Sequence, residues 1–111
     1  MLDATPKLFG TATRTKVLVG LALLGESYPR ELSRLLGLPL MSVQRAIDAF
    51  DQEGVTASRI FGVQRQVRLN PRYFALPQLR ELLLRLGESL PEERRTIEQQ
   101  RRRPRRARKA L

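Results

Sequence analysis

The sequence predicts a mainly α-helical domain that carries one two-stranded β-ribbon. Aliphatic residues recur at helical spacing along most of the 111 residues, whereas residues 55–69 form two β-compatible runs on either side of a glycine. A chain of this length has room for one domain with a modest core. Aromatic residues make up only 5% of the chain and Trp is absent, so the core must consist of aliphatic side chains.

The first predicted helix follows a short N-terminal arm, residues 1–10, and runs from about Thr11 to Leu24. Thr11 or Thr13 can cap its start, and Gly25 can end it in a left-handed conformation. Its apolar stripe consists of Val17, Leu18, Leu21 and Leu24.

Two further helices are predicted around a tight turn. Pro29 suits the first turn of one helix and Gly37 ends it, while Glu31 favours its positive end. The next helix spans about Leu40 to Glu53, where Gly54 stops it. Their inward faces are predicted to hold Leu32, Leu35 and Leu36, followed by Val43, Ala46, Ile47 and Phe50.

The ribbon follows directly. Residues 55–60 and 63–69 are β-compatible runs separated by Phe61-Gly62, and the second run alternates, with Val67 and Leu69 on one face. Residues 11–75 are therefore expected to form one domain.

Residues 76–100 are predicted to be helical. The leucine stripe between Leu76 and Leu86 either closes the core or meets a second copy across a two-fold axis. We favour dimerisation, with the first helix contributing. A further helix from Pro91 to about Arg103 is almost without apolar residues, so it is expected to pack on little.

The chain has neither Cys nor His. Disulfides, thiolate or imidazole metal sites and His-based acid/base catalysis are thereby excluded. Asp48 and Asp51 share a helical face, but no phosphate-binding loop accompanies them, so we expect no enzyme, no catalytic residue and no cofactor. The longest uncharged stretch, residues 17–25, is too short to cross a bilayer, and no signal-peptide layout is present. We expect a cytoplasmic protein without membrane contact.

The net charge of +10 is concentrated at one end. Residues 101–111 contain six Arg and one Lys and no acid, which predicts a disordered basic tail. Such a tail is either simply solvated, adds non-specific DNA affinity or binds an acidic surface. Basic proteins of this size bind nucleic acid more often than membranes.

Several short segments, taken in their order along the chain, resemble those of a known family. They are residues 13–18, 30–32, 35–38, 42–47, 53–55 and 67–70. From Leu8 to about Phe74 the chain resembles the winged helix-turn-helix of bacterial transcription regulators, closest to the arsenical-resistance-repressor type. The resemblance implies a homodimer that binds a roughly palindromic operator, usually as a repressor, with residues 40–53 in the major groove. Metal-sensing members use Cys and His ligands, which this chain lacks, so any effector is unknown. Pro39 departs from the usual Ser and cannot cap the helix through its side chain.

Burial of the apolar face of residues 40–53 turns a polar face outward. Gln44 can bind an adenine edge and Arg45 can fork onto guanine, while Ser42 suits a phosphate or the helix cap. Asp48 is expected to pair with Arg45 three residues before it. The predicted base-contacting residues are Met41, Ser42, Gln44 and Arg45, and the alternative is an ordinary solvated helix face.

Arginines without intervening acids follow in the ribbon, where phosphates and the minor groove would attract them. The predicted backbone or wing contacts are Arg30, Arg34, Arg59, Gln64, Arg65 and Arg68. Polar ribbon edges also carry Arg for solubility. The function expected is a sequence-specific double-stranded DNA-binding regulator associated with the nucleoid. The alternative is a winged-helix adaptor that binds protein or RNA.

Overall fold

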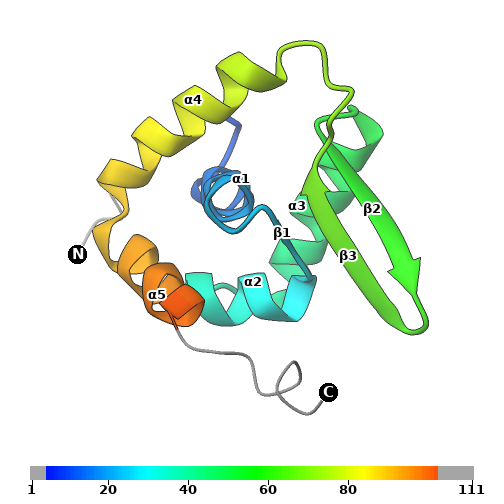
Figure 1. The fold of residues 1–111 in the computed structure, drawn as a ribbon, viewed down its shortest axis with the longest axis horizontal. Helices are drawn as coiled ribbons and strands as arrows, with labels where there is room; N and C mark the ends of the chain where they lie inside the picture. The colour runs from blue at the N-terminus through cyan, green and yellow to red at the C-terminus, as the bar shows by residue number, and fades with distance from the viewer. Residues whose placement is uncertain (1–4, 103–111) are drawn as a thin grey trace.

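Helix α1 lies at the centre of the computed structural model, which describes residues 5–102. Figure 1 shows α1 end-on, with the other helices and a small sheet arranged around it. The elements are α1 (Ala12–Leu24), β1 (Glu26–Ser27), α2 (Pro29–Leu36), α3 (Leu40–Gln52), β2 (Thr56–Phe61), β3 (Gln64–Leu69), α4 (Leu76–Leu86), the short 3₁₀ helix η1 (Gly87–Ser89) and α5 (Pro91–Arg102). The mainly helical class predicted from the sequence is confirmed.

Most of the apolar stripe of α1 is buried against other elements of the same chain. Val17, Leu18 and Leu21 are fully buried. Gly20 permits a close approach of α2, since a Cβ there would lie 3.2 Å from Cδ2 of Leu32. The three buried residues of the stripe are therefore not available for a dimer contact, and Leu24, the fourth, is half-buried. A contribution of this helix to a homodimer stays a prediction.

Helices α2 and α3 are the two helices predicted around a tight turn. Gly37 ends α2 with φ 65°, the left-handed region that glycine adopts without strain. The Ser33 hydroxyl donates to the Leu38 carbonyl at 2.5 Å, which fixes the turn. Helix α3 begins at Leu40 as predicted, although its capping residue Pro39 makes no side-chain hydrogen bond.

The sheet has three antiparallel strands in the order β1-β3-β2, so the predicted count of two strands was wrong. The extra strand is only two residues long, and Ser27 pairs with Val67 of β3. Two residues are too few to show alternation. Pro29, which follows the strand after one intervening residue, Tyr28, favours an extended conformation before it whether or not a strand forms. Strands β2 and β3 form the hairpin, here called the wing, with Phe61 opposite Gln64 and a Gly62-Val63 turn.

Helices α4 and α5 complete the covering of α1. Leu83 of α4 and Ile97 of α5 are 0% and 1% exposed. Lys16 of α1 lies 3.3 Å from Glu93 of α5, and Arg101 donates to the Leu23 carbonyl at 2.8 Å. The prediction that this last helix packs on little was wrong, because the buried Ile97 and these polar contacts dock it against the rest of the fold.

The predicted tail boundary also shifts. Arg101 and Arg102 belong to α5, so residues 101–111 are not one unstructured segment. Residues 103–111, where the rest of the predicted tail falls, lie outside the described part of the chain, as do residues 1–4 of the predicted arm. None of the helices between residues 5 and 102 is long and apolar enough to span a bilayer.

Candidate nucleic-acid interface

The outward face of α3 is left uncovered by the other residues that the structure describes, 5–102. Val43, Ile47 and Phe50 are buried in the core, which turns the opposite side of the helix to solvent. Met41 is 61% exposed and Arg45 is also exposed, whereas Gln44 is half-buried. All four residues predicted to contact bases, including the half-buried Ser42, border this face.

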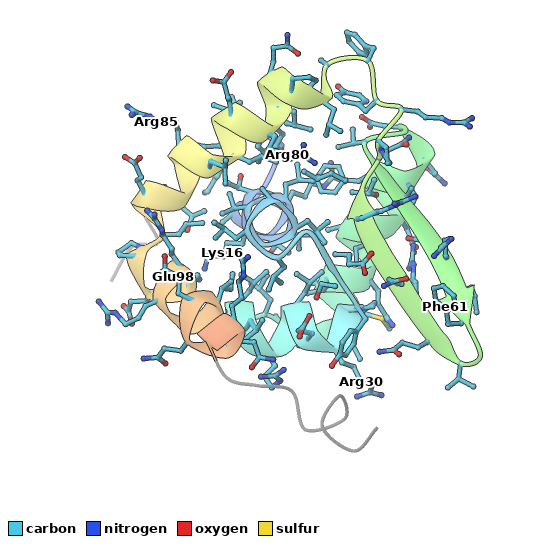
Figure 2. All side chains as sticks on the ribbon, in the orientation of Figure 1. Lys16, Arg30, Phe61, Arg80, Arg85 and Glu98 are labelled. Atoms are coloured by element: carbon cyan, nitrogen blue, oxygen red, sulfur yellow. The ribbon has the colours of Figure 1, made fainter. Side chains whose placement is uncertain are left out.

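On one side, α3 borders a groove that separates it from the wing. This helix–wing groove has a volume of about 460 Å³ and is lined by Tyr28, Pro29, Arg30, Leu40, Gln44, Val63, Gln64 and Arg65. It brings together Arg30, Gln44 and Gln64, which come from three separate elements. Figure 2 places Arg30 at the start of α2, on the same side of the molecule as Phe61 of the wing. Arg34 is exposed on α2 but does not line the groove.

On the other side, α3 borders the start of α1. A hollow of about 240 Å³ is lined by Thr11, Thr13, Arg14, Ser42, Arg45 and Ala46. This α1–α3 hollow combines two guanidinium groups with three hydroxyls, a donor set suited to a phosphate. Sequence reasoning missed Arg14 and Thr13 as site residues. The signal was a Thr-Arg-Thr run at a helix start, but nothing in the local sequence places that start beside α3.

Arg65 is held against α3 by two carboxylates. Its Nη2 lies 2.9 Å from Asp48 Oδ1 and donates to Asp51 Oδ2 at 2.9 Å. Its Nε donates to the Ser58 hydroxyl at 3.2 Å, and Thr56 donates to Asp51. The predicted pairing of Asp48 with Arg45 is therefore wrong. Arg45 points toward the α1 side of the helix, whereas Asp48 points toward the wing.

The pKa values of this cluster follow from its contacts. Burial acts to raise the pKa of Asp51, but hydrogen bonds from Thr56, Ser58 and Arg65 outweigh it and hold that pKa below its usual value. Burial likewise acts to lower the pKa of Arg65, yet the two carboxylates raise it overall. The opposite charges of Asp51 and Arg65 therefore partly cancel beside the exposed face of α3.

The remaining wing cations lie on the opposite face of the hairpin. Pairing registers place Arg59 opposite Gln66 and Arg68 opposite Ala57, and these residues alternate with the inward Val67 and Leu69. Arg59 and Arg68 are exposed. Within residues 5–102, no ion pair joins Arg30, Arg45, Arg59 or Arg68 to a carboxylate. These guanidinium groups are free to meet an anion.

Comparison with known proteins adds no relative. No protein-family model matches the sequence, and a search of curated proteins finds no significant match. The features that bear on function are therefore the geometry of α3, the two hollows beside it and the arginines without a carboxylate partner.

Proposed function

We propose that this protein is a sequence-specific double-stranded DNA-binding regulator that acts as a repressor. In this proposal α3 enters the major groove, while the wing contacts the backbone or the minor groove. The observation that carries the proposal is the uncovered face of α3, where Arg45 is exposed and Gln44 opens into the helix–wing groove. Such a repressor works at the nucleoid.

The two hollows beside α3 support a division of roles. Gln44 and Arg45 have the donors and acceptors to read adenine and guanine edges. Arg14 in the α1–α3 hollow and Arg30 in the helix–wing groove flank them, one on each side of α3. Phosphate contacts of this kind fix the register without reading sequence.

Pairing of Arg65 with Asp48 supports the same assignment. An unpaired carboxylate on the DNA side of α3 would repel phosphates. The guanidinium of Arg65 lies 2.9 Å from Asp48, so it offsets that repulsion. In this proposal Arg65 contributes chiefly by neutralising α3 and holding the wing, and only secondarily by contacting DNA.

The proposal includes a homodimer. Exposed apolar residues are present on α4, where Leu82 and Leu84 are 39% and 43% exposed, and just before it, where Phe74 is 89% exposed. A two-fold dimer would present two copies of α3 to a palindromic site. Sedimentation equilibrium with the wild type and with Leu82→Glu tests this. A wild type that stays monomeric with and without DNA would contradict it.

The decisive test is selection from a random duplex library, followed by binding at several salt concentrations. We expect one enriched motif, and we expect Arg45→Ala to abolish preference at one position, at a cost of about 1–3 kcal/mol. Arg85→Ala is the matched control, because Arg85 lies on α4, away from the wing in Figure 2. No enriched duplex would instead favour the adaptor that binds protein or RNA.

A further inference from the structure

The tip of the wing is apolar, and the DNA contacts proposed for α3 and for the arginines do not explain this. Ile60 is 68% exposed, Phe61 is 52% exposed and Val63 is completely exposed. None of the three residues belongs to the buried core, so packing against that core does not account for them.

The tip has the shape of a narrow wedge. Phe61 pairs with Gln64 and Ile60 pairs with Arg65, so the last two rungs of the ladder place apolar side chains on opposite faces. Val63 extends the tip through the two-residue turn, where Gly62 has φ 60°. Glycine makes this tight turn possible, since an L side chain at that φ is strained.

The charges around the tip favour a polyanion as the partner that it contacts. The guanidinium carbon of Arg59 lies 4.8 Å from the centre of the Phe61 ring. Between Thr56 and Leu69 the wing contains no acidic residue. Val63 and Gln64 also line the helix–wing groove together with Gln44, so the tip is continuous with the face of α3.

We propose that the wing tip inserts Phe61 and Val63 between stacked base pairs of the minor groove and thereby bends the duplex. This inference rests on the proposed function, since it takes the same DNA as its ligand. Apolar wedges that part a base step kink DNA, and pyrimidine–purine steps such as TA part most readily. The arginines beside the tip hold the flanking phosphates during insertion.

The experiment measures bending directly. A short duplex with a central TA step, carrying a fluorescence donor and acceptor at its ends, is titrated with the wild type, Phe61→Ala/Val63→Ser and the conservative Phe61→Leu. We expect energy transfer to rise with the wild type and with Phe61→Leu. With the double variant we expect it to stay near the level of free DNA, with affinity reduced roughly tenfold. All three proteins should unfold at the same temperature, because these side chains are exposed.

The outcomes separate the two proposals. A duplex bound but not bent by the wild type, or bent equally by the double variant, overturns the wedge and leaves the regulator standing. Tip-dependent bending of every duplex without sequence preference supports the wedge and overturns the sequence-specific regulator. Absence of duplex binding overturns both. Stronger tip-dependent binding to a single strand or to anionic vesicles, without bending, also overturns the wedge.

Discussion

Arg65 of β3 donates a 2.9 Å hydrogen bond to Asp51 of α3, and this contact ties the wing to the helix beside it. The same guanidinium lies 2.9 Å from Asp48, one turn earlier on α3. A planar guanidinium that bridges two carboxylates fixes both distance and angle. The spacing between helix and wing is thereby set before any ligand arrives, which lowers the cost of ordering on binding.

Replacing Arg65 is expected to weaken DNA binding more than replacing a wing arginine that has no carboxylate partner. In Arg65→Ala, Asp48 loses its partner and faces the phosphates, so we expect about a tenfold loss, roughly 1.4 kcal/mol. Arg68→Ala removes only one exposed cation and serves as the comparison. Fluorescence anisotropy with one duplex at fixed salt measures both.

The double variant Arg65→Ala/Asp48→Asn separates the effect of the unpaired Asp48 charge on DNA binding from the structural effect of losing Arg65. It should recover the part of the affinity that is lost to the unpaired carboxylate of Asp48, whereas the part lost with the Arg65–Asp51 contact should remain lost. Equal losses in Arg65→Ala and Arg68→Ala, with no recovery in the double variant, would show that the pairing has no effect on binding.

Asp51 is expected to link stability to acid pH. Its pKa in the folded protein is held below the ordinary value of 3.8, because hydrogen bonds from Thr56, Ser58 and Arg65 outweigh the opposing effect of burial. A lowered folded-state pKa contributes stability above that ordinary value, which is lost as pH falls through the folded pKa. Asp51→Asn should therefore cost about 1–2 kcal/mol at neutral pH and unfold with a flatter acid profile.

Urea unfolding between about pH 7 and pH 2 measures this profile. Glu53→Gln is the control, since Glu53 is an exposed carboxylate just after α3. An acid profile of Asp51→Asn that matches the wild type would contradict the assigned role of this cluster.

The helical part of the fold could be predicted because individual capping and terminating residues mark where its helices begin and end. Thr11 caps α1 by accepting from the Arg14 amide at 3.1 Å, and Gly25 and Gly37 end α1 and α2 in positive-φ conformations. Strand β1 could not be predicted, since a two-residue strand exists only through its pairing with β3. The docking of α5 was missed because it depends on Ile97 and Leu90 rather than on a full stripe.

The site was predictable only in part. Alternation along β3 already places Arg65 on the face of Val67 and Leu69, opposite Arg68. That Asp48 pairs with Arg65 depends on the angle at which α3 meets the sheet, and local sequence does not encode this angle. The neighbourhood of Arg14 and Arg45 depends in the same way on the packing of α1 against α3.

Ile97→Ala is expected to destabilise the protein by about 2–4 kcal/mol. The side chain is 1% exposed in a helix whose other residues are mostly polar, so its loss removes the principal apolar anchor of α5. Thermal or urea unfolding measures the change. Gln99→Ala, on the exposed side of α5, should change stability by less than about 0.5 kcal/mol. Similar small effects for both variants would mean that α5 is not part of the cooperative unit.

Arg14 and Arg45 share one hollow but are expected to act differently on DNA. If Arg14 contacts a phosphate, Arg14→Ala lowers the slope of log affinity against log salt by about 0.9 and weakens all sequences alike. Arg45→Ala should instead relax the preference at one base pair of the selected site. Binding to the selected and to a scrambled duplex across a salt series measures both effects. Arg14 also lies 5.9 Å from the Phe50 ring centre, so unfolding of each variant is checked in parallel. An unchanged slope in a folded Arg14→Ala protein would remove the α1–α3 hollow from the DNA interface.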